Sequence, residues 1–250
     1  DALANAAMDG NLPQAQEVTA AAAAPTRSWA PPAAPATRLV LVRHGETDLT
    51  AQRRYSGRGD VSLTARGLDQ ARRAGTRLTR LTAPQSPDAS TRPVAAVVCS
   101  PLQRCRQTAE AIAQVTGNPP VVAEPELIEC DFGVWEGLTF GEVRERWPDE
   151  LNRWLASTSQ APPGGESFDA VATRTSAAVS RLRAGHPGEL VVVVSHVTPI
   201  KLILREALAA GDTFLYRLYL DPAGISIVDF WADGGIAVRA VNDTAHLDQP

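Results

Sequence analysis

The sequence has no apolar run long enough to cross a bilayer, and its first residues lack both the basic region and the apolar core of a signal peptide. These absences predict a protein that does not contact a membrane and that lies in the cytoplasm. Cysteine is scarce as well. Cys99, Cys105 and Cys130 are odd in number and have neither zinc-finger nor Cys-x-x-Cys spacing. We therefore expect free thiols of a reducing compartment.

The chain also lacks an excess of basic charge. Its formal net charge is −4, which argues against binding of nucleic acid through a broad basic surface. A local basic pocket is still compatible with this charge. With 250 residues, 44% hydrophobic and 21% charged, the composition is that of an ordinary globular protein with one sizeable core.

The first part of the chain differs in composition from the rest. Thr19 to Ala36 is mostly Ala, Pro and Thr, which is typical of a linker. Before it, the opening residues "DALANAAMDG" favour a helix but are too few to form one alone. They resemble the closing segment of type I ribonuclease H domains, which has a similar Asp-x-Leu-Ala-Asn run. We expect residues 1–37 to be the stub of an upstream domain plus a linker, or else a tail without function, and residues 38–250 to be the globular domain.

Strand and helix patterns alternate after Arg38. Buried strands are predicted at "RLVLV", "VAAVVC" and "ELVVVVSH", and closing strands at "FLYRLYL", "GISIVDFW" and "IAVRAVN". Helices are predicted after caps at Thr64, Ser100, Thr139 and Ser167. The helix after Ser100 is expected to end near Val115, and a further helix is predicted to begin at Thr198. This alternation predicts an α/β sandwich.

Two of these strands end in a histidine. The strand "RLVLV" is followed by Arg43, His44 and a glycine, and the strand "ELVVVVSH" ends in His196. Ligands of open α/β sheets bind at such strand ends, where a glycine lets the backbone come close to the ligand and a buried guanidinium requires an anion. Alone, His44 could equally be a satisfied interior histidine. Two such endings in one sheet predict two imidazoles that converge on one pocket.

Further charged candidates follow. Arg104 and Arg106 lie in the first turns of a helix that starts at a strand end, which favours an anion, and we expect one of the two to be solvated. At least one of four carboxyl groups set among apolar residues is expected to be desolvated enough to act as an acid near neutral pH; they are Glu126, Glu129, Asp131 and Glu136.

Six segments in order, "LVRHGET", "GDVSLTARGLDQA", "SPLQRCRQTA", "ECDFGVWEG", "PGGES" and "VVSH", resemble the histidine phosphatase superfamily of phosphatases and phosphoglycerate mutases. The resemblance covers Arg38 to about Val241. It implies a three-layer α/β/α sandwich with a mostly parallel mixed sheet. It also implies that His44 is a nucleophile that becomes phosphohistidine and that Glu129 is the proton donor and then the general base.

The same resemblance implies a phosphate clamp of Arg43, Arg104 and His196, which needs neither a metal nor a cofactor. It also points to substrate contacts at Thr50, Ser56, Gly57 and Val197. Three of these depart from the common pattern: Thr50 stands where many relatives have Asn, Ser56 where they have Gln, and Val197 where they have Gly. Thr50 and Ser56 still offer a hydrogen-bonding oxygen, whereas Val197 narrows the expected pocket.

The expected function is therefore hydrolysis of a small phosphomonoester. "ECDFGVWEG" and "RYSGRGDVSLT" look most like α-ribazole phosphatases of cobalamin assembly, and four aromatic residues could stack on an aromatic leaving group: Tyr55, Phe132, Trp135 and Trp154. A phosphoglycerate-type mutase is the first alternative, which the short stretch between Glu129 and Ser167 disfavours. The second is a non-catalytic phosphate-binding module on a ribonuclease H domain, the one route by which we expect contact with nucleic acid.

Overall fold

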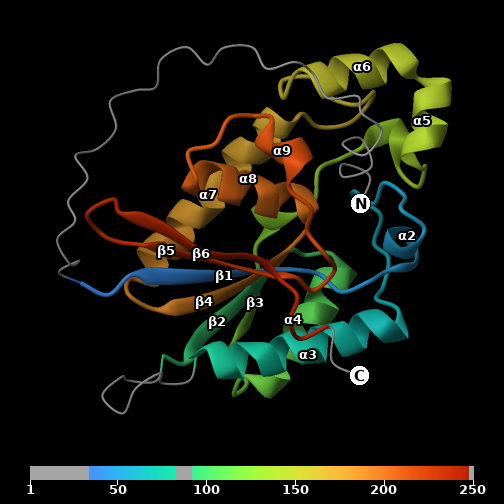
Figure 1. Ribbon diagram of the computed structural model, residues 1–250. Helices are drawn as coiled ribbons and strands as arrows, with labels where there is room; N and C mark the ends of the chain where they lie inside the picture. Colours follow the sequence, from blue (N-terminus) through green and yellow to red (C-terminus); the bar gives the residue numbers. More distant parts are fainter. Residues whose placement is uncertain (1–33, 83–91, 248–250) are drawn as a thin grey trace.

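The computed structural model describes residues 34–82 and 92–247 (Figure 1). The expected stub and most of the expected linker lie outside the described residues. The first described element, β1, begins at Thr37.

One mixed sheet forms the centre of the molecule. Its strands are β1 (Thr37–Arg43), β2 (Val94–Cys99), β3 (Val121–Ala123), β4 (Leu190–Ser195), β5 (Ile225–Phe230) and β6 (Ile236–Asp243). They lie in the order β3-β2-β4-β1-β5-β6. The pairs β3/β2, β2/β4 and β4/β1 are parallel, and the last two pairs are antiparallel. The expected mostly parallel mixed sheet is confirmed.

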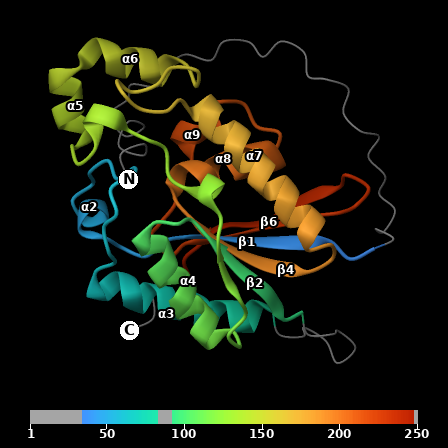
Figure 2. The ribbon, with the colours of Figure 1, turned by 180° about the vertical axis from the view of Figure 1, so that it is seen from behind.

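Helices cover both faces of the sheet. On one face lie α3 (Ala65–Thr82) and α4 (Gln103–Val115), and on the other lie α7 (Phe168–Gly185), α8 (Val197–Ala207) and α9 (Phe214–Arg217) (Figures 1 and 2). Alternate residues of β1 explain the two cores: Leu39 and Leu41 pack toward α7 and α8, whereas Val40 and Val42 pack toward α3 and α4. The expected three-layer α/β/α sandwich is confirmed.

The remaining short helices lie near one end of the sheet. They are α2 (Asp48–Ala51), α5 (Phe140–Arg146) and α6 (Pro148–Ala156), with 3₁₀ turns at Pro125–Leu127 and Gly133–Trp135. The expected capping box of Thr139 and Glu142 opens α5, and Ser167 caps α7 as expected. Thr64 also caps α3, since its hydroxyl accepts the Gly67 amide at 3.0 Å.

Two expectations about elements were wrong, and one strand was not anticipated. Phe214 to Leu220 does not form a strand: its first residues form α9, whose Leu215 carbonyl accepts the buried ammonium of Lys201 from α8 at 2.8 Å, so packing overrides the strand propensity of the aromatic residues. Helix α4 begins at Gln103 after an N-cap at Leu102, so Ser100 does not cap it. Strand β3 was not anticipated, because its three residues are too few to show a pattern.

Gly45 after His44 permits a contact that differs from the one expected. A Cβ there would lie 2.3 Å from the carbonyl oxygen of Gly67, and a Cβ on Gly67 would lie 2.2 Å from that of Glu46. The glycine therefore admits the first turn of α3 rather than a ligand, and this contact holds the segment after β1 in place.

Within the described ranges, 34–82 and 92–247, no helix is long and apolar enough to cross a membrane.

Candidate active site

The two strand-end histidines meet. Strands β1 and β4 are neighbours in register, with Arg43 opposite Ser195, so His44 and His196 leave the sheet side by side. The His44 amide donates to the Ser195 carbonyl at 3.0 Å. Their ring centroids are 5.2 Å apart, and both residues are buried. The two imidazoles meet as expected, but of the two only His44 lines the pocket described below.

His44 has the state of a nucleophile. Its Nδ1 lies 2.7 Å from the Gly45 carbonyl oxygen, which can only accept, so Nδ1 carries the hydrogen and Nε2 keeps its lone pair. Burial, followed by the charges of Arg104 and Arg43, lowers the pKa of His44 well below its ordinary value. The imidazole therefore stays neutral at neutral pH.

Arg104 is the buried cation of the site. Its guanidinium donates to three carbonyl oxygens of one loop, those of Gly59 at 2.7 Å, Gly57 at 2.8 Å and Ser56 at 3.3 Å. Its Nε donates to His196 Nδ1 at 3.3 Å. Arg106, in contrast, is exposed and donates to the Pro101 carbonyl, so the expectation that one of the two arginines is solvated is confirmed.

Arg43 adds a second buried guanidinium. One of its terminal nitrogens donates to the Leu220 carbonyl at 2.5 Å. Its buried Nε has no hydrogen-bond partner among the described residues. A buried donor without a partner is costly, which favours an anion beside Arg43 in the working state.

His196 is fixed by Ser100, which the sequence indicated as a helix cap and not as a site residue. Its Nε2 lies 2.7 Å from Ser100 Oγ, and since Nδ1 accepts from Arg104, the neutral ring carries its hydrogen on Nε2. Burial and the nearby Arg104 lower the pKa of His196 well below its ordinary value. Ser100 looked like a helix cap because Ser-Pro at a strand end is typical of one.

Glu129 differs from the other three carboxyl candidates in its burial. It is 4% exposed, and burial raises its pKa despite hydrogen bonds from the Cys130 amide, at 2.8 Å, and from Thr198. Glu126 pairs with Arg181, and Asp131 accepts the Gly133 amide at 2.8 Å. Of the four, Glu129 has the environment of an acid that keeps its proton toward neutral pH.

Glu136 has a different function that sequence reasoning missed. Its carboxylate accepts the amides of Gly57, at 2.8 Å, and Gly59, at 3.2 Å, in the loop whose carbonyls bind Arg104. A Cβ on Gly57 would lie 2.7 Å from Glu136 Oε2, so the glycine makes this approach possible. The expected contact residue Gly57 thus holds the loop and Arg104 together. The two glycines of "SGRG" were the available signal.

A pocket opens beside His44. It is lined by Arg43, His44, Thr50, Arg53, Arg54, Tyr55, Ser56, Glu129, Phe132, Val197 and Thr198. Thr50, Ser56 and Val197 thus lie where substrate contacts were expected, and Ser56 Oγ is a buried atom with no hydrogen-bond partner in the described part of the chain. Arg53 and Arg54 were not anticipated, because consecutive arginines usually indicate a solvated surface.

The four aromatic candidates divide into two pairs. Tyr55 and Phe132 line the pocket with ring centroids 4.9 Å apart. Trp135 and Trp154 are fully buried and pack edge to face in the core at 5.4 Å, so they are not available for stacking on a leaving group.

No group of three or more metal-binding side chains occurs among the residues that the structure describes. The described cysteines are free and buried, and burial raises the pKa of the Cys99 thiol to about 11.

Comparisons with known proteins identify the family to which this chain belongs. The model of the histidine phosphatase superfamily (branch 1) matches residues 39–244. A bifunctional protein of Mycobacterium tuberculosis is 46% identical over 99% of this chain, which spans 66% of that relative's length. A metal-independent phosphoserine phosphatase of Arabidopsis thaliana is 36% identical over 79% of this chain and 82% of its own. The solved α-ribazole phosphatase of Shigella flexneri has a TM-score of 0.68 and 27% identity, over 83% of this chain and 96% of its own.

We predict that Arg104→Lys weakens binding of inorganic phosphate about 10- to 100-fold, as expected for the loss of one or two charge-assisted hydrogen bonds. A lysine keeps the charge, but it cannot bind three carbonyls and an anion with one ammonium group. Calorimetric titration with phosphate measures the effect. Arg106→Lys, on the same helix but exposed, is the matched control. Equal affinities for the two variants would remove Arg104 from the phosphate site.

Proposed function

The chain belongs to the histidine phosphatase superfamily, and from this premise we propose that it is a metal-independent phosphomonoesterase that works through a phosphohistidine at His44. One observation carries the proposal. A neutral imidazole with a free Nε2 lies close to two buried arginines and a second histidine, in a pocket that is also lined by a carboxyl group whose burial raises its pKa.

The first step is transfer of the phosphoryl group to the enzyme. Nε2 of His44 forms a bond to phosphorus as the bond to the ester oxygen breaks, and Glu129 gives its proton to the departing alkoxide. The charge on the three other phosphate oxygens is stabilised by the guanidiniums of Arg43 and Arg104, and His196 orients Arg104 by accepting from its Nε.

The second step releases phosphate. Glu129, now a carboxylate, takes a proton from a water molecule whose oxygen attacks phosphorus, and the bond to His44 Nε2 breaks. His44 leaves as a neutral imidazole, and Glu129 is protonated again. The cycle needs a group that alternates between acid and base, which suits a carboxyl group with a pKa raised toward neutrality.

The leaving-group side of the pocket supports a substrate class. Arg53 lines the pocket, is exposed, and has a backbone φ of 55°, which is unfavourable for a residue with a side chain. Its side chain makes no hydrogen bond or ion pair with another described residue, whereas Arg54 donates to Glu142 at 3.0 Å. A free guanidinium at this rim favours an ester whose alcohol carries a second anionic group, such as a carboxylate.

Other functions remain to be compared with this one. α-Ribazole 5'-phosphate, which the sequence resemblance suggests, has a neutral alcohol with an aromatic base that could contact Tyr55 and Phe132. A phosphoglycerate-type mutase would return phosphate to the substrate instead of releasing it, which an assay of free phosphate distinguishes.

For the whole protein we propose a second domain of the ribonuclease H type before residue 1. The opening Asp-x-Leu-Ala-Asn run and the bifunctional relative, of which this chain spans 66%, support it. A non-catalytic phosphate-binding module on such a domain would bind phosphate and show no turnover. Hydrolysis of an RNA–DNA hybrid by the longer protein tests the upstream domain.

We predict that His44→Ala loses all but a few per cent of the turnover of p-nitrophenyl phosphate and forms no acid-labile phosphoenzyme after a rapid quench, because no other neutral imidazole nitrogen faces the substrate. Vanadate should still bind to the remaining clamp. His186→Ala, a histidine that pairs with Glu189 far from the pocket, is the control. Normal turnover by His44→Ala would assign the nucleophile elsewhere.

We predict a pH dependence set by Glu129. Its pKa is raised, so its acid form, and with it His44 phosphorylation by an alkyl ester, is lost as the pH rises through that pKa. The pKa of His44 is lowered, so the acid limb of the profile lies well below the ordinary histidine value. Glu129→Gln should remove the alkaline limb and slow phosphorylation by glycerol 2-phosphate by about 10²–10⁴. p-Nitrophenyl phosphate, whose leaving group needs little protonation, should be affected much less.

Glu126→Gln and Asp131→Asn are the controls for this profile, because both carboxyl groups belong to the same segment. If one of them showed the leaving-group dependence while Glu129→Gln behaved like wild type, the acid would be that residue instead.

We predict that Arg53→Gln raises KM for phosphoserine and 3-phosphoglycerate about 3- to 10-fold with little change in kcat, since an exposed ion pair contributes modestly to binding. KM for glycerol 2-phosphate, whose alcohol is neutral, should stay constant. Each preparation of the variant is therefore compared on anionic and neutral alcohols. The proposed class of substrates, phosphate esters whose alcohol carries an anionic group, would be contradicted by two results together. These are preference of the wild type for α-ribazole 5'-phosphate and no effect of Arg53→Gln on phosphate esters that carry a carboxylate.

A further inference from the structure

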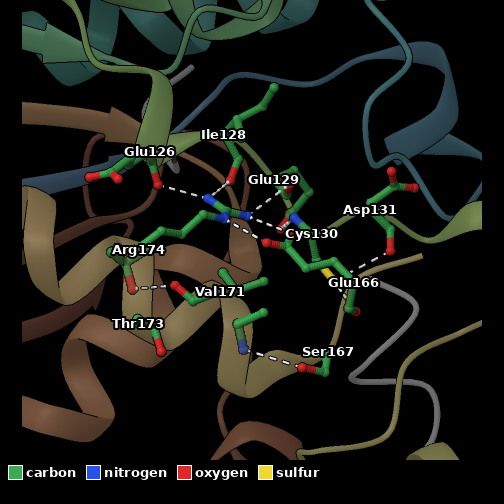
Figure 3. A network of polar contacts seen from close by, with 12 residues as sticks. Glu126, Ile128, Glu129, Cys130, Asp131, Glu166, Ser167, Val171, Thr173 and Arg174 are labelled. Carbon is green, nitrogen blue, oxygen red and sulfur yellow. Dashed lines mark hydrogen bonds and ion pairs between the residues drawn. The ribbon is translucent and has the colours of Figure 1, made fainter.

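Arg174 of α7 has all of its hydrogen-bond donors in use. Its guanidinium donates to the carbonyl oxygens of Glu126 at 2.7 Å, Ile128 at 2.5 Å and Glu129 at 3.1 Å. It also donates to both carboxylate oxygens of Glu166, at 2.9 and 3.0 Å. Figure 3 shows the side chain reaching from α7 into the bend of the segment that carries Glu129. A guanidinium has five N–H groups, so none remains for a substrate.

These contacts fix the backbone from which the acid projects. Arg174 binds the carbonyls of the two peptides that flank the Glu129 Cα, those of Ile128 and Glu129, and this restricts the direction of the Glu129 Cα–Cβ bond. The side chain is then oriented by the Cys130 amide, which donates to Glu129 Oε1 at 2.8 Å. Proton transfer depends on such geometry, since a displacement of about 1 Å can cost on the order of 10²-fold in rate.

The position of the charge matters as much as the geometry. A cation in contact with the Glu129 carboxylate would lower its pKa and remove its proton at neutral pH. Arg174 instead contacts the main-chain oxygen of Glu129, and its charge is matched by the bidentate carboxylate of Glu166. The segment is therefore held by an arginine while burial keeps the pKa of Glu129 raised.

Glu166 also contacts the loop that binds Arg104. Its Oε2 accepts from Arg58 at 3.1 Å. Arg58 belongs to the loop whose carbonyls, those of Ser56, Gly57 and Gly59, bind Arg104. One carboxylate thus joins the segment that carries the acid to the loop that holds the clamp.

We propose that the Arg174–Glu166 pair is a positioning device for proton transfer: it sets the place of the Glu129 carboxyl group relative to the phosphate clamp. The proposal rests on the proposed function, because it assumes that Glu129 is the acid and base of a phosphohistidine cycle. A merely structural pair would lower the amount of folded enzyme or slow all substrates equally. A positioning pair affects the step that needs a proton.

The experiment compares two esters on each variant. Arg174→Lys keeps the charge but loses the five-donor fork, and Glu166→Gln keeps the shape but weakens the hold on Arg174 and Arg58. Arg181→Lys is the matched control, because Arg181 is an exposed residue of the same helix and contacts the same segment through the carboxylates of Glu124 and Glu126. Rapid-quench measurement gives the rate of His44 phosphorylation by glycerol 2-phosphate and by p-nitrophenyl phosphate. The ratio of the two rates is independent of the folded fraction.

We expect Arg174→Lys to slow phosphorylation by glycerol 2-phosphate about 10- to 100-fold and phosphorylation by p-nitrophenyl phosphate less than about threefold, as for a displaced general acid. With p-nitrophenyl phosphate, whose first step stays fast, phosphohistidine should accumulate in Arg174→Lys, because the attacking water loses its base. Glu166→Gln should change the ratio in the same direction, and Arg181→Lys should leave it unchanged. In a Glu129→Gln background, Arg174→Lys should add no further change to the ratio, as expected for residues that act as a unit.

An unchanged ratio in both Arg174→Lys and Glu166→Gln overturns the inference, as does an additive effect in the Glu129→Gln background. Should Arg174→Lys fail to fold, the Glu166→Gln ratio decides alone. The wild-type reaction separates this result from the wider proposal. Absence of phosphohistidine in the wild type contradicts the proposed function, whereas normal phosphohistidine with unchanged ratios contradicts only the positioning device.

Discussion

The buried guanidinium of Arg104 is the constraint on which the site depends. A charge without exposure to water must be surrounded by acceptors, and here these are three carbonyls of the loop from Ser56 to Gly59. Such a loop offers its carbonyls inward only if its amides are satisfied elsewhere. Glu136 does this for two of them, and its close approach requires glycine at position 57. One buried charge thus determines a loop, a carboxylate and a glycine.

The same burial shifts the pKa values of Glu129 and His44, the proposed acid and nucleophile, in opposite directions. Loss of water disfavours whichever form is charged, so it raises the pKa of Glu129 and lowers that of His44. The two arginines push the His44 pKa down further. Because Arg174 contacts the main chain of Glu129 and is matched by Glu166, its charge is not directed at the carboxyl group. A general acid and a neutral imidazole can therefore lie in one pocket without neutralising each other.

The sequence allowed most strands of the sheet and both histidines to be predicted, because strand periodicity and strand ends are local patterns. Glu129 was one of four carboxyl candidates, and only the resemblance to a known family distinguished it. The residues that the sequence did not reveal act through contacts distant in the chain, most of them with the backbone. Glu136 binds the Gly57 and Gly59 amides, and Arg174 binds carbonyls 45 to 48 residues away, whereas Ser100 binds the side chain of His196. A carbonyl has no side-chain identity, so no residue pattern marks these partners. The strand predicted at Phe214 to Leu220 was wrong for a related reason. The helix α9 that forms there offers its Leu215 carbonyl to Lys201, a contact that no residue pattern marks.

The choice of cation follows from these contacts. Lys201 is the only lysine in the chain, and its ammonium makes one hydrogen bond, to a single carbonyl. Burial lowers its pKa to about 7, so its charge varies across the neutral range. An arginine keeps its charge throughout that range, and its planar fork can bind several carbonyls at once. Arg104 and Arg174 each bind three carbonyls, a task for which one ammonium group lacks the geometry. Arg104 and Arg174 therefore hold their loops with a charge that stays constant over the pH range in which Lys201 titrates.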